Sequence, residues 1–255
     1  MYEFHNEGFF GYGEEGDFTP YGLAYFIPLI LFAAAIVLTV LKRDKLRAWK
    51  GEKTFRLVFA FVLMMFEMSY YWRVLYVGTE GKGDIFMTLL PLQICEWGSY
   101  CAIFMMVSLS DTLFGINYFV TLTGAGIALL VPQMVISNSG PGYYHYYSFW
   151  GEHLLPIFAV FYVMIVHGKR PRYRHIWISY GCMFLLGIPA TLLNLKYEKA
   201  NYMYLKTEVS FIPDSYVLRV VIFTVGMLLL FHMLWGIWVL VEKKRKKKLA
   251  GSAAG

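Results

Sequence analysis

The stretch YGLAYFIPLILFAAAIVLTVL, Tyr21 to Leu41, contains no charged residue. A helix needs roughly 20 consecutive apolar residues to cross the hydrocarbon core of a bilayer. Further apolar segments of similar length follow along the chain. We therefore predict an all-α, polytopic membrane bundle of about seven transmembrane helices, over residues 21–41, 55–77, 85–107, 115–134, 149–167, 175–195 and 216–240.

The overall composition agrees with a membrane protein. The 255-residue chain is 58% hydrophobic, 19% aromatic and 16% charged, and its mean hydropathy is +0.51. A soluble domain carries about 25% charged residues. A net charge of +6 is also found in nucleic-acid-binding proteins, but here the basic residues stand in short connectors and at the C-terminus. That pattern indicates topology signals and contact with anionic lipids, so no nucleic-acid partner is expected.

The basic connectors also predict an orientation. The first twenty residues hold five acidic residues and no Lys or Arg. The positive-inside rule then places the N-terminus outside and the C-terminus in the cytoplasm. We expect an extracytoplasmic segment over 1–20, a transmembrane domain over 21–240 and a basic cytoplasmic tail over 241–255, in a multi-pass protein of the cell membrane. The basic clusters are Lys42, Arg43, Lys45, Arg47, Lys50 and Lys53; Lys169, Arg170, Arg172 and Arg174; and Lys243, Lys244, Arg245, Lys246, Lys247 and Lys248.

Several classes of site are excluded by the residues. The three cysteines show no CxxC spacing, so neither a disulfide framework nor a zinc site is expected, and no metal or other cofactor is predicted. Residues 216–240 contain no Lys, which argues against a retinal Schiff base, and no HExxH motif is present. The N-terminal segment does not resemble a cleavable signal peptide. The last six residues, AGSAAG, resemble an artificial extension and are left aside.

Polar residues inside the predicted spans are the candidates for function, because ionisable groups are costly in hydrocarbon. The stretch LLPLQICEWGSY, 89–100, places a thiol between an amide and a carboxylate. Counted along the spans, Cys95, His153 and Arg73 all fall in the outer half of the bilayer, Cys95 about 15 Å deep. His232 falls in the inner half and is not placed in the site. The other polar residues in spans are Glu67, Gln93, Glu96, Glu152, Asn194 and Arg219.

A thiol and an imidazole in one layer suggest nucleophilic chemistry. An imidazole can take the thiol proton, and the thiolate then attacks an acyl carbonyl. A third polar group usually orients the imidazole; Glu67 or Gln93 could do so, and Glu67 could alternatively pair with Arg73. The competing reading is structural, because a buried cysteine often behaves as a small hydrophobe. Cys101 and Cys182 are assigned to that class.

Four segments together carry a family resemblance. LLPLQIC, SFWGEHLLPIFAVFYV, RPRYR and NYMYL occur in this order between residues 89 and 205. They resemble the family of transmembrane protein 164 and its bacterial relatives, over about residues 18 to 240. The resemblance implies a cysteine-dependent acyltransferase that moves fatty acyl chains between phospholipids, with the cysteine at Cys95 and the histidine at His153. It also places Asn201 and Tyr202 at the outer rim of the site.

Two features qualify this expectation. The family pattern before the cysteine is usually Leu-Pro-Leu-His, and Gln93 stands where that His would be. Gln can hydrogen-bond but cannot act as a base, so the chain is active only if His153 is the base. The aromatic run GYYHYYSFW, which ends at Trp150, is either an interfacial belt or the mouth of a lipid-binding cleft.

The leading hypothesis is therefore a membrane-embedded transacylase. It would carry an acyl chain as a thioester from a phospholipid to a lipid or lipoprotein acceptor, with no soluble cofactor. The alternative is a non-catalytic lipid- or ligand-binding protein: a transport accessory, a receptor or an assembly factor. The sequence leaves the donor, the acceptor and the oligomeric state open.

Overall fold

The computed structural model describes residues 8–11, 13, 17–78, 89–131, 139–206 and 215–253. These ranges contain helices and turns but no strand, and six of the helices are long and apolar enough to cross a membrane. The predicted all-α membrane bundle is confirmed. Its elements are α1 (Leu23–Ala48), α2 (Glu52–Val77), α4 (Ile94–Ser108), α5 (Asp111–Leu130), α6 (Tyr144–Val166), α7 (Arg174–Lys196), the 3₁₀ segment η2 (Tyr202–Tyr204) and α8 (Tyr216–Ala253).

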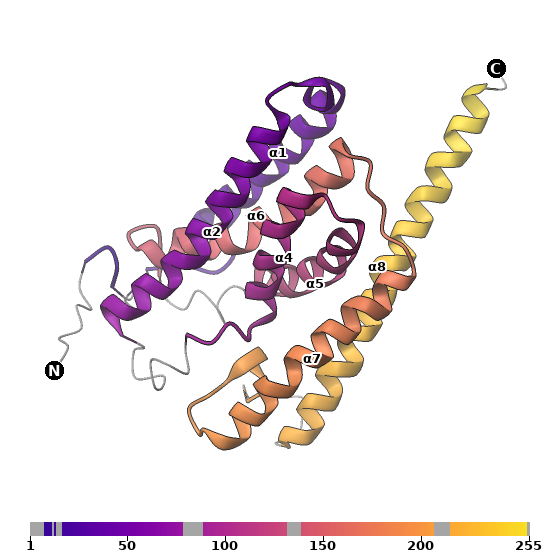
Figure 1. Ribbon diagram of the computed structural model, residues 1–255. Coiled ribbons are helices and arrows are strands. Elements are labelled where there is room, and N and C mark those ends of the chain that lie inside the picture. The colour runs from indigo at the N-terminus through magenta and orange to yellow at the C-terminus, as the bar shows by residue number, and fades with distance from the viewer. Residues whose placement is uncertain are drawn as a thin grey trace.

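Helix α5 joins the two parts of the bundle. It packs against α4 and α6 on one side and against α7 and α8 on the other (Figure 1). Helix α1 packs mainly against α6, and α2 packs against α4 and α6. The side chains of α4, α5 and α6 form the centre of the core, where Met105, Phe119 and Val163 are fully buried. Helices α1 and α8 instead leave most of their apolar residues exposed, as helices that face lipid do.

The third predicted span, 85–107, differs most from the observed structure. Among its described residues, 89–107, the helix begins at Ile94; α4 has 15 residues and is too short to cross a bilayer alone. The reason is local: Pro91 has no N–H to donate, and Gln93 has extended backbone angles at the N-cap. Residues 85–88, and 132–134 of the fourth predicted span, lie outside the described part of the chain.

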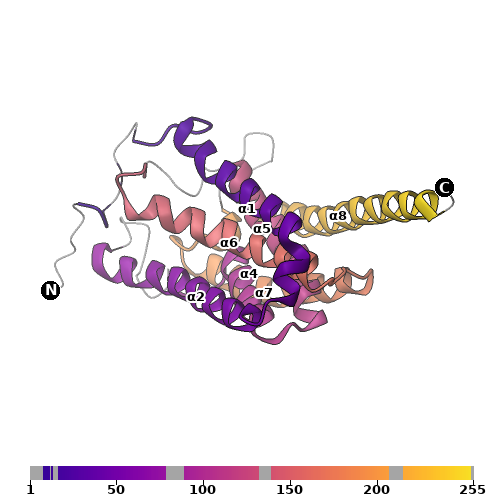
Figure 2. The same ribbon diagram turned by 90° about the horizontal axis from the view of Figure 1, so that it is seen from above.

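Two helices extend further than predicted. Helix α1 continues through most of the first basic cluster to Ala48, and α8 continues through the basic tail. Lys and Arg favour the helical backbone, and their charges interact well with a helix C-terminus. The basic residues there are thus the last turns of helices, and not irregular connectors. The end of α8 projects beyond the other helices (Figure 2).

Several turns meet at one end of the bundle, which we call the basic end. The α1–α2 turn, the α4–α5 turn and the α6–α7 connector lie there, because contacts join them. Arg47 Nε at the end of α1 donates to Val166 O at the end of α6, over 2.7 Å. Lys169 pairs with Asp111, the first residue of α5. All three basic clusters lie at this end, as the positive-inside rule requires of one face; that it faces the cytoplasm stays a prediction.

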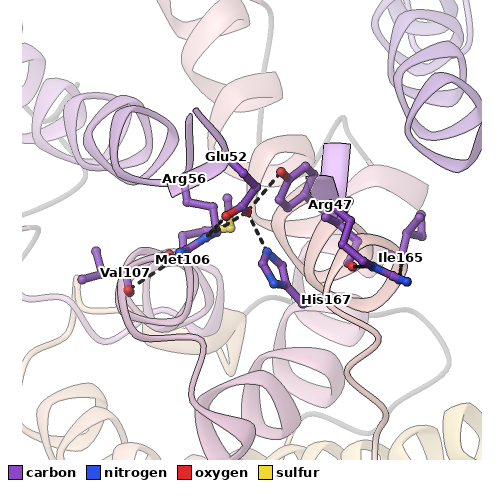
Figure 3. A network of polar contacts seen from close by, with 9 residues as sticks. Arg47, Glu52, Arg56, Met106, Val107, Ile165 and His167 are labelled. Atoms are coloured by element: carbon purple, nitrogen blue, oxygen red, sulfur yellow. Dashed lines mark hydrogen bonds and ion pairs between the residues drawn. The ribbon is translucent and has the colours of Figure 1, made fainter. Parts of the chain in front are cut away.

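A buried ion network closes the basic end (Figure 3). Arg56 is 6% exposed, and its Nε lies 2.9 Å from Glu52 Oε1. The same carboxylate oxygen accepts from His167 Nε2, at 2.6 Å, and from Tyr162 OH, at 3.2 Å. Arg56 also donates to the carbonyl of Met106. The network thus joins α2 to α6 through the Glu52 carboxylate and α2 to α4 through the Arg56 guanidinium.

Replacing Arg56 tests this network. Arg56→Met should lower the free energy of unfolding by about 3–5 kcal/mol, because the buried Glu52 carboxylate loses its main counter-charge. Thermal unfolding of the purified protein in detergent would measure the change. Lys53→Met, at an exposed neighbouring position, should leave stability near wild type. Adding Glu52→Gln to Arg56→Met should restore part of the loss; no restoration would contradict the proposed charge imbalance.

Close helix packing at Gly115 gives a second prediction. A Cβ atom on Gly115 in α5 would lie 2.1 Å from the His175 ring in α7, whereas one on Gly126 in the same helix meets nothing within 4 Å. Gly115→Ala should therefore destabilise the protein by about 1–3 kcal/mol through overpacking. Gly126→Ala should be neutral or slightly stabilising, because Ala favours helix. Thermal unfolding would compare the two, and equal effects would contradict the packing argument.

Candidate functional site

The start of α4 is built around its N-cap. Gln93 N donates to Glu96 Oε2 over 2.8 Å, which satisfies one of the N–H groups that a helix start leaves unpaired. Trp97 Nε1 donates to Pro91 O over 3.1 Å and fixes the preceding segment. Cys95 is the second residue of this helix and is partly exposed. Cys95 is therefore not preceded by the continuous helix that the sequence predicted, and its depth in the bilayer stays a prediction.

The segment around η2 lies against this helix start. Met203 N donates to Gln93 Oε1 over 2.8 Å. Asn194, at the end of α7, holds Tyr202 by two hydrogen bonds, from Asn194 Nδ2 to Tyr202 O at 3.0 Å and from Tyr202 N to Asn194 Oδ1 at 2.8 Å. Asn201 Oδ1 accepts from the Lys206 backbone N–H at 2.8 Å. The Asn201–Tyr202 segment is thus adjacent to the start of α4.

The backbone of this segment is strained. Met203 and Tyr204 both have positive φ angles, of 56° and 55°. Residues other than glycine rarely adopt this left-handed conformation, and where they do the surrounding contacts hold them in it. Here the hydrogen bonds from Gln93 and Asn194 supply that constraint. The two strained residues are consecutive and lie next to helix α4, which carries Cys95.

Two tyrosines of the segment approach the helix start. Tyr202 is 5% exposed, and burial raises its pKa to about 12, with a further contribution from the charge of Glu96. The pKa of Tyr204 is also raised above its usual range, because surrounding protein desolvates its phenol group although the residue as a whole is 41% exposed, and Cys95 and Glu96 add to this effect. Both phenols are therefore protonated at neutral pH and can donate a hydrogen bond beside the thiol.

Three carboxyl groups from three helices converge on the same place. Glu67 of α2, Glu96 of α4 and Glu152 of α6 lie within electrostatic range of one another, and Cys95 is within range of all three. The Ser99 side chain is close to the Glu67 carboxyl group. One carboxylate oxygen of Glu152, Oε1, is buried and has no hydrogen-bond partner among the described residues. The cluster gives the site several acceptors for the hydroxyl or ammonium groups of a bound molecule.

Most of this cluster was not assigned to the site from the sequence. Of the three carboxylates only Glu67 was selected, and Tyr71 and Tyr100 were not considered. The two phenol oxygens are 3.1 Å apart, and Tyr71 also hydrogen-bonds Glu96. The signal was present in part: Glu152 directly precedes His153, and a carboxylate in a span is a candidate by default.

Arg73 lies near the C-terminal end of α2. Its Nε and Nη2 donate to the carbonyls of Phe10 and Gly11, both over 3.0 Å, so it holds the N-terminal segment against the bundle. Its charge also acts on Glu152. Arg73 thus borders the carboxyl cluster.

His153 is held in one orientation on α6. The side chain is 2% exposed, and Nδ1 lies 2.7 Å from Phe149 O. A carbonyl can only accept, so Nδ1 carries the proton and the neutral ring has its lone pair on Nε2. Nε2 is buried and has no partner among the described residues. Within the part of the chain that the structure describes, no hydrogen bond therefore joins the His153 imidazole to the Cys95 thiol.

Trp150, predicted at a lipid-binding cleft, lies in the aromatic core. It is buried, and its ring contacts Tyr25, Tyr146 and Phe149 at centroid distances of 5.6, 6.1 and 5.1 Å. Its predicted contact with lipid stays a prediction. Among the described residues, no three His, Cys, Asp or Glu side chains are grouped to hold a metal ion.

Comparison with known proteins gives one result. The model of the TMEM164 family matches residues 18–239, which is most of the chain, and the chain therefore belongs to this family. The resemblance found in the sequence is confirmed. No match was found among curated proteins or among solved structures.

The Gln93–Met203 hydrogen bond can be tested directly. Gln93→Met removes the acceptor at similar side-chain length and leaves the Met203 N–H unpaired, which costs about 1–3 kcal/mol. The Met203 amide should then exchange hydrogen about fivefold faster or more, measured by hydrogen-exchange mass spectrometry. Gln93→His, which restores both an acceptor and the family pattern, should keep most of the protection. Equal exchange in all three proteins would contradict this role of Gln93.

Proposed function

We propose that this member of the TMEM164 family is a membrane-embedded, cysteine-dependent transacylase that moves a fatty acyl chain between lipids through a thioester on Cys95. The observation that carries the proposal is the state of His153. Its Nδ1 is hydrogen-bonded to Phe149 O, so that Nε2 carries the lone pair and has no hydrogen-bond partner among the described residues. Helix α4 packs directly on α6, and the proposal requires that a bound substrate or a movement of these helices brings the thiol and the imidazole together.

The first half-reaction acylates Cys95. His153 Nε2 takes the thiol proton as the sulfur attacks the ester carbonyl carbon of a glycerophospholipid. The C–S bond forms, the C–O bond to the glycerol breaks, and the imidazolium returns its proton to the leaving oxygen. A lysophospholipid departs and the acyl chain stays on the sulfur.

The second half-reaction releases the chain. His153 takes the proton of an acceptor hydroxyl, the acceptor oxygen attacks the thioester, and the C–S bond breaks. The proton returns to the sulfur, so the enzyme is regenerated without water or a cofactor. A lipoprotein amine would react by the same steps. In this proposal the protonated phenols of Tyr202 and Tyr204 donate to the carbonyl oxygen as it gains charge, and their raised pKa values support this role.

Exposed apolar side chains around the thiol support a lipid substrate. Leu90, Trp97 and Tyr204 surround the start of α4 and are each more than a third exposed. Lipid tails could therefore reach Cys95 from the side of the bundle. The carboxyl cluster would accept hydrogen bonds from the polar head of the same lipid.

The alternative is a lipid-binding membrane protein without catalysis. It is favoured by the role of Gln93, which replaces the family histidine and here accepts a structural hydrogen bond. Such a protein would retain its lipid-binding affinity after Cys95→Ser, whereas an enzyme would lose acyl transfer. The Cys95→Ser substitution therefore distinguishes the enzyme from the binding protein.

The enzymatic reading predicts a covalent adduct. Purified protein incubated with phospholipid and lysophospholipid should gain the mass of one acyl group at Cys95, with transfer products detected by lipid mass spectrometry. Cys95→Ser should remove the adduct and lower transfer by about a thousandfold or more. His153→Gln should slow transfer by about 10²–10⁴-fold. Cys182→Ser, at a free cysteine elsewhere, should behave as wild type; an unmodified Cys95 after incubation would support the binding protein instead.

A further inference from the structure

Three arginines from three segments come together at the basic end. Arg47 belongs to the last turn of α1, Arg170 to the connector between α6 and α7, and Arg245 to the extended part of α8. The charges of Arg47 and Arg245 both act on Arg170. This place is far from the thiol-bearing helix start, which is at the opposite end of the bundle.

Arg170 is held rigidly in this group. Its Nη1 donates to Met164 O at 2.8 Å and to Lys169 O at 3.0 Å, and its guanidinium lies 5.5 Å from the centre of the Trp238 ring. Stacking on an aromatic face is a typical arginine contact. Its Nε and Nη2 donate to no acceptor within the described residues, so one edge of the fork is available to a ligand.

The other two arginines are also oriented by the protein. Arg47 donates to Val166 O and to Ile165 O, at 2.7 and 3.4 Å (Figure 3). Arg245, whose side chain is 52% exposed, donates to Glu242 Oε1 at 2.8 Å. A guanidinium group has five N–H donors, so Arg47 and Arg245 both have N–H groups left over after these hydrogen bonds.

The charges at this place do not balance. Besides the three guanidinium groups, Glu242 is the carboxylate that acts on Arg170. Burial lowers the pKa of Arg170, and repulsion from Arg245 and Arg47 lowers it further, partly offset by Glu242. An anion between the three groups would relieve this repulsion. A planar fork suits a phosphate oxygen pair better than a halide.

We propose that Arg47, Arg170 and Arg245 bind the phosphate of an anionic phospholipid at the ends of α1, α6 and α8. The lipid source is favoured by the surroundings, because Leu41 of α1 and Leu240 of α8 expose apolar side chains at 71% and 61% next to these ends. Trp238 is of the residue type that lies at headgroup level. Basic pockets between membrane helices bind anionic headgroups in this way. The site is independent of the acyl transfer proposed above.

Native mass spectrometry of the full-length protein in detergent tests the proposal. Phosphatidylglycerol should bind more tightly than phosphatidylcholine. Arg245→Gln should weaken phosphatidylglycerol binding by about fivefold, and Arg170→Gln with Arg245→Gln by about 25-fold, at roughly fivefold for each basic contact. Thermal unfolding confirms that each variant is folded; Arg245→Gln alone carries the test if the double variant is not.

The matched control is Lys243→Gln with Lys244→Gln. It removes two positive charges, as the double arginine variant does, from the turns of α8 next to Arg245. It should change phosphatidylglycerol binding less than about twofold, since a defined site and not general charge is responsible. Equal losses in control and arginine variants would overturn the site. Displacement of the lipid by millimolar inorganic phosphate would overturn the lipid assignment and indicate a site for free phosphate.

Discussion

A helix that starts inside a membrane bundle must have its first N–H groups paired by protein, because hydrocarbon offers no acceptor. Helix α4 meets this requirement with two side chains. Glu96 accepts from Gln93 N, and Gln93 in turn accepts from Met203 N in a segment more than a hundred residues away. These two bonds determine where α4 begins. They also bring the strained η2 segment next to Cys95.

The same constraint accounts for Gln93 at the position where the family resemblance implied a histidine. The contact made there is acceptance of a backbone N–H, which both side chains can provide. A histidine at this position would add a base, but His153 already offers an unpartnered Nε2 on the neighbouring helix α6. A glutamine at this position is therefore compatible with a mechanism in which His153 is the single base. The Gln93 side chain holds the η2 segment at the site through its hydrogen bond with Met203 N.

The two ends of the bundle differ in the charged groups that they hold. At the basic end, Glu52 pairs with Arg56 and accepts a hydrogen bond from His167, which joins α2 to α6, while the arginines around Arg170 give this end an excess of positive charge. At the opposite end, Arg73 holds the N-terminal segment and borders the carboxyl cluster. The apolar core thus separates the basic end, which we propose binds an anionic headgroup, from the end that holds Cys95.

The sequence by itself determined the helical membrane class, most helix positions and the family, because runs of apolar residues and the order of short motifs are local properties. It also identified Cys95 and His153 as candidates. Only the tertiary structure decided that α4 begins at Ile94, that Glu96 and Glu152 join Glu67 around the thiol, and that Trp150 is a core residue. Apolar periodicity is weak in a protein surrounded by lipid, because both the core and the outer face are apolar. Which face of a helix a side chain occupies therefore depends on contacts between distant segments, such as Gln93 with Met203. The sequence of one span does not indicate which other segment it packs against.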